Sequence, residues 1–266
     1  MSDWLKISGK VVVVTGGSSG IGKAIVESLL KENVSVINLD IQQGELNNEN
    51  LLFIKTDVTS RAQVESAVKQ GIEKFGTIDG VVNNAGINIP RLLIDPQNPH
   101  GEYELSDDIF DKMVAINQKG LFLVAQTVGR ILVEKKEGVI INMSSECGLE
   151  GSEGQSCYAA TKAAVNGFTR SWAKELGKHN VRVVGIAPGI MEETGLRTLA
   201  YETALSYTRG ITVEQLRKGY TNTSATPMGR SGKLSEVADL VSYYLSDRSS
   251  YITGVTTNVA GGKTRG

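Results

Sequence analysis

The sequence predicts an α/β fold, a doubly wound, parallel, seven-stranded sheet with helices on both faces. Short apolar runs rich in β-branched residues alternate with helical patterns along the chain, which is typical of parallel βαβ units. The first run, residues 11–14, is four valines, and a strand without polar positions is expected to be covered on both faces. We expect residues 1–266 to form one domain with a sizeable core.

The elements follow in a regular order. Strands are expected at residues 11–16, 34–40, 51–57, 78–86 (running into a turn), 138–145, 181–189 and 254–262. Apolar residues at helical spacing, such as Ile21, Ile25 and Leu29, predict a helix after the first strand. Further helices are expected at residues 60–74, with Ser60 as N-cap, and at 106–116, 120–135, 157–178 and before the last strand.

Residues 190–231 interrupt this alternation. The stretch is polar, helical in parts, and contains Pro227 near its end. It follows the sixth strand, so it starts at the carboxyl edge of the sheet, where ligands bind in open α/β folds. We interpret it as a lid over a substrate; a surface excursion without a role in binding is the alternative.

Composition narrows the functional classes. The net charge is −1, which gives no indication of nucleic acid or of an anionic membrane surface as a partner. The N-terminal residues lack the pattern of a signal peptide, and two cysteines do not make a disulfide framework. We expect a cytoplasmic protein.

A glycine-rich turn joins the first strand to the first helix. Without side chains there, the backbone N–H groups of the turn and the helix N-terminus can approach a pyrophosphate. A glycine cluster alone could be a plain turn, but its place between strand and helix favours a dinucleotide and a Rossmann-type fold. The cofactor-binding residues predicted here are Gly16, Ser18, Ser19, Gly20, Ile21 and Gly22.

Asp40 ends the second strand, eighteen residues after Gly22. A carboxylate at this point can accept hydrogen bonds from both ribose hydroxyls of NAD and would repel the 2′-phosphate of NADP. Ser18, Ser19 and the residues after Asp40 offer no cation for that phosphate. We therefore predict NAD as cofactor; a solvent-facing carboxylate would leave the preference open.

The third and fourth strands end in polar residues at the same edge. Asp57 could bind the adenine amine or cap the following turn, and Val58 follows it. Gly86 would let the ribose come close, while Asn84 could mainly tie strand ends together. We count Asp57, Val58, Asn84, Ala85 and Gly86 among the cofactor-binding residues.

A candidate catalytic group lies near the fifth strand. Tyr158 and Lys162 are four residues apart on a predicted helix, so they share one face, and an ammonium would lower the pKa of the phenol. Ser145 ends the fifth strand and could hold a substrate oxygen. Taken alone, the Tyr/Lys pair could be an aromatic anchor beside a solvated lysine, and Asn117 a polar helix residue with a local contact.

The motifs TGGSSGIG (15–22), NNAG (83–86) and YAATK (158–162), with Asn117 and Ser145, resemble the short-chain dehydrogenase/reductase family over the whole chain. The resemblance implies that Tyr158 is the acid/base, that Lys162 lowers its pKa and binds the nicotinamide ribose, and that Ser145 stabilises the reacting oxygen. It also implies a water-linked proton path through Asn117, and it implies no catalytic metal. Further cofactor contacts implied are Tyr158, Lys162, Pro188, Gly189, Ile190 and Thr194, the last being one position later than usual.

Longer stretches (90–95, 144–164, 187–198 and 254–266) are similar to bacterial members that oxidise hexitol phosphates in hexitol catabolism. This implies a small-molecule substrate with a phosphate, which requires cations or backbone donors. The family also implies a homotetramer, and we expect the C-terminal tail to reach a neighbour's site and help to hold the phosphate. The candidate substrate-binding residues are Arg91, Glu150, Glu153, Arg197, Lys263 and Arg265, each of which could instead be solvated.

Two other functions share these motifs. A 3-oxoacyl-carrier-protein reductase would usually take NADPH and carry basic residues near the glycine turn. A non-catalytic, cofactor-sensing regulatory protein is possible because fold does not fix function. The complete set of Asn117, Ser145, Tyr158 and Lys162 favours an enzyme.

Overall fold

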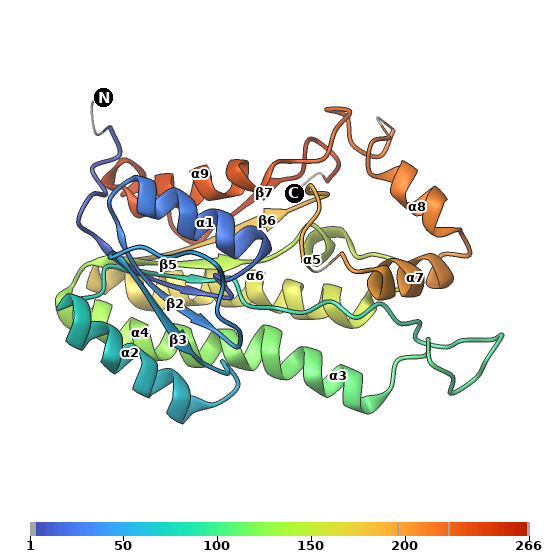
Figure 1. Cartoon of the computed structure of the whole chain (residues 1–266), viewed down its shortest axis with the longest axis horizontal. Coiled ribbons are helices and arrows are strands. Elements are labelled where there is room, and N and C mark those ends of the chain that lie inside the picture. Colours follow the sequence, from blue (N-terminus) through green and yellow to red (C-terminus); the bar gives the residue numbers. More distant parts are fainter. Residues whose placement is uncertain (1–3, 196, 223, 265–266) are drawn as a thin grey trace.

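A computed structural model describes residues 4–195, 197–222 and 224–264 and has the predicted α/β architecture (Figure 1). Seven parallel strands form one sheet in the order β3-β2-β1-β4-β5-β6-β7. The strands are β1 (Val11–Thr15), β2 (Ser35–Asp40), β3 (Leu51–Lys55), β4 (Gly80–Asn83), β5 (Gly138–Met143), β6 (Val181–Pro188) and β7 (Thr256–Val259).

Helices cover both faces of the sheet (Figure 1). On one face α1 (Gly20–Lys31) packs beside α9 (Leu234–Leu245). On the other face lie α2 (Arg61–Phe75), α4 (Leu121–Lys135) and α6 (Ser156–Leu176). Ser60 caps α2 as predicted, because its side chain accepts a hydrogen bond from the N–H of Gln63.

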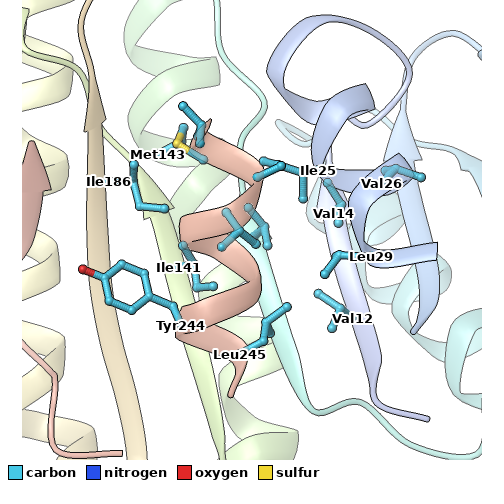
Figure 2. Close-up of a cluster of buried hydrophobic side chains, with 14 of the residues drawn as sticks. Val12, Val14, Ile25, Val26, Leu29, Ile141, Met143, Ile186, Tyr244 and Leu245 are labelled. Atoms are coloured by element: carbon cyan, nitrogen blue, oxygen red, sulfur yellow. The ribbon is translucent and has the colours of Figure 1, made fainter. Parts of the chain in front are cut away.

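The valines of β1 explain why a strand without polar positions forms here. Val12 and Val14 belong to the cluster under α1 and α9, whereas Val11 and Val13 belong to the cluster on the opposite face. Figure 2 shows the first cluster, in which Val12 and Val14 meet Ile25 and Leu29 of α1. Burial on both faces of a central strand therefore accounts for the apolar run.

The strand order reverses between β1 and β4. The chain goes from β1 outward to β2 and β3, then returns to β4 on the other side of β1 and continues outward to β7. At such a switch point the loops after the two central strands diverge and leave a crevice at the carboxyl edge. The glycine turn after β1 and the segment after β4 border this crevice.

The structure fixes the ends of two predicted strands. Within the range 78–86, predicted to run from a strand into a turn, the strand ends at Asn83, because the N–H groups of Asn84 and Ala85 bond to the hydroxyl of Thr15. The last strand ends at Val259 instead of 262, because Gly261 and Gly262 turn the chain with φ of +59° and +84°.

Helical segments also differ from the prediction. The expected gap at 117–119 is a π-helical segment, η1 (Ala115–Gly120), that joins α3 (Asp107–Val114) to α4 without a break. Five further short helical segments were not predicted individually. They are α5 (Cys147–Glu150), η2 (Gly177–His179), α7 (Leu199–Thr208), α8 (Val213–Gly219) and η3 (Asp247–Ser249). None of the helices in the described ranges is long and apolar enough to cross a membrane.

The substitution Gly22→Ala tests how closely the glycine turn packs against the start of α1. A Cβ at this position would lie 1.9 Å from the carbonyl oxygen of Gly16, so Gly22→Ala must displace backbone. We expect the free energy of unfolding to fall by about 3 kcal/mol, measured by denaturant titration without cofactor. Gly167→Ala, within α6, is the control, since its Cβ meets nothing within 4 Å and should stabilise the helix by up to about 1 kcal/mol. Equal effects of the two substitutions would contradict the packing argument.

Candidate active site

A cavity of about 660 Å³ opens at the carboxyl edge of the sheet, within the size range of small-molecule sites. Its walls come from the turns after β1, β2, β4, β5 and β6, from the start of α6, and from the α7–α8 region. Most predicted site residues line it. They are Gly16, Ser19, Gly20, Ile21, Asp40, Asp57, Val58, Asn84, Ala85, Gly86, Ser145, Tyr158, Lys162, Pro188, Gly189, Ile190, Thr194, Arg197 and Lys263.

The glycine turn presents bare backbone to the cavity. Gly16 and Gly20 have φ of +66° and +52°, a conformation that favours glycine. Two predicted contacts do not line the cavity. Ser18 faces Asn38, whose amide donates to its hydroxyl, and Gly22 packs against the carbonyl of Gly16. Ser18 and Gly22 therefore stabilise the conformation of the turn without lining the cavity.

The carboxylate of Asp40 is fixed at the end of β2. Its Oδ2 accepts a hydrogen bond from the N–H of Ser18 at 3.0 Å, and its Oδ1 accepts one from Gln42 at 3.2 Å. Asp57 also makes local bonds, because its Oδ1 accepts from both the N–H and the hydroxyl of Thr59. Both interpretations of Asp57 thus have support, since it caps a turn and also borders the cavity.

Asn84 ties two strand ends together, as one of the sequence interpretations held. Its amide nitrogen donates to the carbonyl oxygens of Thr15 and Gly16, at 3.0 and 3.1 Å. Gly86 lies next to the catalytic candidates. A Cβ on it would lie 3.2 Å from Oδ1 of Asn117 and 3.5 Å from Nζ of Lys162, so the absence of a side chain keeps the space beside the amine open.

The structure brings Ser145, Tyr158 and Lys162 together. Ser145 follows β5 and lowers the pKa of the nearby Tyr158 phenol, which belongs to the first turn of α6. One turn further along α6, Nζ of Lys162 lies 5.7 Å from the centroid of the Tyr158 ring and donates to the carbonyl of Met143 at 2.7 Å. The amine is thus held beside the ring by β5.

The pKa of Tyr158 differs from the prediction that the ammonium lowers it. Loss of hydration deep in the cleft raises the pKa of Tyr158, and the nearby Cys147 thiol raises it further, whereas the hydrogen bond with Ser145 opposes the rise. Burial also lowers the pKa of Lys162 to about 8. The amine is directed to the Met143 carbonyl, so in the protein alone burial outweighs its attraction for a phenolate.

Asn117 is buried within η1 and does not line the cavity. Its amide nitrogen donates to the carbonyl of Ile87 and to the hydroxyl of Thr161, and its Oδ1 accepts from the N–H of Ile87. The side chain therefore ties the loop after β4 to α6. A π-helical segment at a functional site is a recurrent feature of enzymes.

The segment after β6 folds back over the glycine turn. Pro188 accepts a hydrogen bond from the N–H of Glu146, and a Cβ on Gly189 would lie 2.8 Å from Oε2 of that residue. Further on, the Cβ of Thr194 lies 3.3 Å from the position of a Cβ on Gly20. Thr194 therefore lies near the turn after β1 and lines the cavity.

The predicted substrate contacts separate into two groups. Arg197 and Lys263 line the cavity, but Arg91, Glu150 and Glu153 do not, and Arg265 lies outside the described residues. Arg91 does not line the cavity, because its guanidinium donates to the Pro90 carbonyl and lies over the ring of Tyr103.

The described part of the C-terminal tail contacts its own chain. Lys263 lies in the cavity of its own chain, where Nζ donates to Glu146 at 2.7 Å and to Glu150 at 3.2 Å. The hydroxyl of Thr264 donates to the other oxygen of Glu146. Burial disfavours the ammonium of Lys263, but its bonds to the two carboxylates outweigh that effect and raise its pKa.

Sequence reasoning missed residues that complete the wall. Gln155, Tyr201 and Arg209 line the cavity and are connected, with Ser152, by hydrogen bonds. No sequence motif singles them out, because the α7 residues reach the cavity only through the path of the 190–231 segment. Glu146, which directly follows Ser145, accepts hydrogen bonds from Lys263 and Thr264 of the tail.

The cleft fits a dinucleotide. In the described structure, no side chain caps the N-terminus of α1, and no acidic residue occupies its first turn, so the N–H groups there can receive an anion. Asp40 offers carboxylate oxygens at the end of β2, and Gly86 leaves free space beside Lys162. Within the same ranges, no three His, Cys, Asp or Glu side chains are grouped in a way that could hold a metal ion.

Fold and site together define a nucleotide-dependent oxidoreductase of the α/β class, and a family model described as short chain dehydrogenase matches residues 10–205. The chain belongs to this family. It is 60% identical, over 268 residues and the full length of both chains, to the sorbitol-6-phosphate 2-dehydrogenase of Klebsiella pneumoniae. It is 36% identical to a 3-oxoacyl-[acyl-carrier-protein] reductase of Thermotoga maritima, which covers 97% of this chain and 99% of the relative.

A solved structure agrees with the fold. A 3-ketoacyl-(acyl-carrier-protein) reductase from Brucella melitensis, complexed with NADH, superposes with a TM-score of 0.81 at 28% identity. The match covers 97% of this chain and 100% of the other. The family and this fold establish a nicotinamide cofactor for the chain.

The buried amine of Lys162 makes the free energy of unfolding depend on pH. Between its folded pKa of about 8 and its ordinary value of 10.5, the unfolded chain binds the proton that the folded chain releases. Stability therefore rises with pH through this window. Relative to Lys162→Met, we expect the wild-type free energy of unfolding to gain about 3 kcal/mol from pH 8 to 10.5, measured by denaturant titration.

The control is Lys174→Met, which removes an exposed amine from the same helix and should follow the wild type at every pH. A constant difference between wild type and Lys162→Met across the window would mean that the amine is not buried as described.

Proposed function

We propose that this chain oxidises D-sorbitol 6-phosphate to D-fructose 6-phosphate, reversibly, with NAD as hydride acceptor. The observation that carries the proposal is the 60% identity, over the whole chain, to a protein named sorbitol-6-phosphate 2-dehydrogenase. The test is NAD reduction with a panel of hexitol phosphates, free hexitols and hydroxyacyl thioesters. Turnover of the thioesters alone would contradict the proposal.

In the proposed reaction Tyr158 is the acid/base. Its phenolate takes the proton of the C2 hydroxyl while a hydride leaves the same carbon, and Ser145, which lines the cavity together with Tyr158, holds the reacting oxygen. A bound oxidised nicotinamide supplies the hydride acceptor and a positive charge that favours the phenolate. Lys162 keeps its amine beside the Tyr158 ring and binds the nicotinamide ribose. Asn117 fixes the loop after β4 and supports the proton path to Lys162.

Removing the hydroxyl of Tyr158 tests this assignment. Tyr158→Phe should lower kcat by about 10³-fold, since general acid–base catalysis contributes on that order, and should leave the KM for NAD within threefold. The measurement is steady-state NAD reduction. Tyr243→Phe, a phenol that does not line the cavity, is the control and should retain full turnover. Near-normal turnover of Tyr158→Phe would remove Tyr158 from the mechanism.

The cofactor contacts follow from the lining of the cavity. We assign the pyrophosphate to the backbone of Gly16, Ser19, Gly20 and Ile21, with Ser18 and Gly22 supporting the turn. Asp57 and Val58 border the adenine, while Asn84, Ala85 and Gly86 border the ribose. Pro188, Gly189, Ile190 and Thr194 border the nicotinamide amide. The preference for NAD is assigned to Asp40, whose carboxylate faces the cavity at the end of β2.

Asp40→Asn tests the cofactor preference, because asparagine keeps one of the two oxygens that accept backbone hydrogen bonds and removes the charge that repels a 2′-phosphate. We expect the ratio of kcat/KM for NAD to that for NADP to fall about 10- to 100-fold. Asp57→Asn is the matched control and should weaken both cofactors equally. An unchanged ratio in Asp40→Asn would contradict the role of the carboxylate.

Residues 190–231 are proposed to act as the substrate lid of the domain. The segment contributes cavity wall from Met191 through Tyr201 and Arg209 to Tyr220 and Ala225. Its helices have their own caps, with Thr198 on α7 and a capping box of Thr212 and Gln215 on α8. Capped helices allow the segment to keep its shape while it covers the cleft.

We infer that the enzyme works as a homotetramer in the cytoplasm. Phe110 of α3 is 46% exposed and Phe122 of α4 is 36% exposed, and large exposed apolar side chains on this helical run support a subunit contact. A second candidate activity, reduction of 3-oxoacyl groups, is supported by the 36% identity to a reductase of that name. The substrate panel and a comparison of NADH with NADPH separate the two activities.

A further inference from the structure

Two arginines line the part of the cavity wall that comes from the 190–231 segment. Arg197 precedes α7 and Arg209 follows it, and both line the cavity. Among the residues that the structure describes, neither has a carboxylate oxygen within ion-pair distance, whereas Arg217 of the same segment pairs with Glu202 at 2.6 Å. Two cations that face a cavity without counter-ions indicate a site for an anion.

Both guanidinium groups are held in place by neutral partners. Arg209 donates from Nη2 to the hydroxyl of Ser152 at 2.9 Å. Arg197 donates from Nη2 to the carbonyl of Met191 at 2.6 Å, and its Cζ lies 3.8 Å from the centroid of the Tyr220 ring. An arginine side chain has five N–H donors, so most donors of each group remain for a ligand.

The charges of both arginines act on the phenol of Tyr220. The Cζ of Arg197 lies 3.8 Å from the centroid of this ring. Burial raises the pKa of Tyr220 and Glu202 adds to the rise, whereas Arg197, Arg209 and Arg217 oppose it. A similar link runs to the catalytic residues. Burial raises the pKa of Tyr201 to about 12 while Arg209 opposes it, and Tyr201 in turn affects the pKa of Tyr158. Hydrogen bonds join Arg209 to Tyr201 through Ser152 and Gln155, and these residues all line the cavity.

The other predicted cations are poor candidates for an anion. Lys263 lines the cavity, but its ammonium already faces the carboxylates of Glu146 and Glu150, so that cluster carries net negative charge. Arg91 is outside the cavity, where its Nη1 donates to the Pro90 carbonyl. Of the predicted and newly found cations within residues 4–264 that the structure describes, Arg197 and Arg209 remain.

We propose that Arg197 and Arg209 form the site for the phosphate group of the substrate, which they bind while Tyr158 acts on the hydroxyl at the other end of the molecule. This inference rests on the proposed function. A hexitol 6-phosphate has its reacting C2 four carbons from C6, so it needs a cationic site apart from the catalytic group but in the same cavity. Because both arginines belong to the lid segment, the phosphate also ties α7 over the cleft.

The test compares phosphorylated with free substrate in single variants of the full-length enzyme. Arg209→Met and Arg197→Met should each lower kcat/KM for D-sorbitol 6-phosphate about 10- to 100-fold, the range expected for lost hydrogen bonds to a charged group. The kcat/KM for free D-sorbitol and the KM for NAD should stay within threefold. Arg209→Lys keeps the charge without the guanidinium fork and should fall between wild type and Arg209→Met.

Lys218→Met is the matched control, since it removes an exposed cation of α8 that does not line the cavity, and it should behave as wild type. Equal losses for D-sorbitol 6-phosphate and D-sorbitol in both arginine variants would overturn the phosphate site, because they would indicate a structural role. The proposed function itself fails in a different way, which is absence of wild-type turnover with D-sorbitol 6-phosphate and with D-fructose 6-phosphate.

Discussion

The site depends on the seam between β5 and α6. Three polar contacts join the two elements: Lys162 donates to the carbonyl of Met143, Ser144 donates to the carbonyl of Lys162, and Asn142 donates to Thr169. These contacts set the rotation of α6, and with it the direction in which Tyr158 points. Gly148 of α5 lets that short helix approach α6 beside the seam, since a Cβ there would lie 2.6 Å from the backbone of Lys162.

The rest of the cavity is arranged around this seam. Parallel strands deliver Asp40, Asn84 and Pro188 to the edge where Ser145 and Tyr158 already lie, so that cofactor and substrate regions meet there. The chain closes the remaining side with α7, α8 and its own tail, whose Lys263 and Thr264 bind Glu146 next to Ser145. Hydrogen bonds from the tail thereby stabilise the segment after β5 that contains Ser145 and Glu146.

Much of this was predictable from the sequence, because the signals were local. Runs of valine predicted the central strands, and the glycine turn predicted the crevice. The four-residue spacing predicted that Tyr158 and Lys162 share one helix face. The failures concern long-range partners. The amine of Lys162 turns to Met143, Arg91 turns away from the cavity, Lys263 finds Glu146, and Arg209 enters through the path of α7. No spacing in the chain encodes these pairs, since tertiary packing selects them.

The central claim is that burial keeps Tyr158 protonated in the protein alone and that the positive charge of the oxidised cofactor makes it a base. Ultraviolet difference titration of wild type against Tyr158→Phe, with and without saturating NAD, measures the pKa of this phenol directly. We predict a pKa above the ordinary value of 10.0 without NAD, lower by about two pH units when NAD is bound. The same pKa in both titrations would contradict the account.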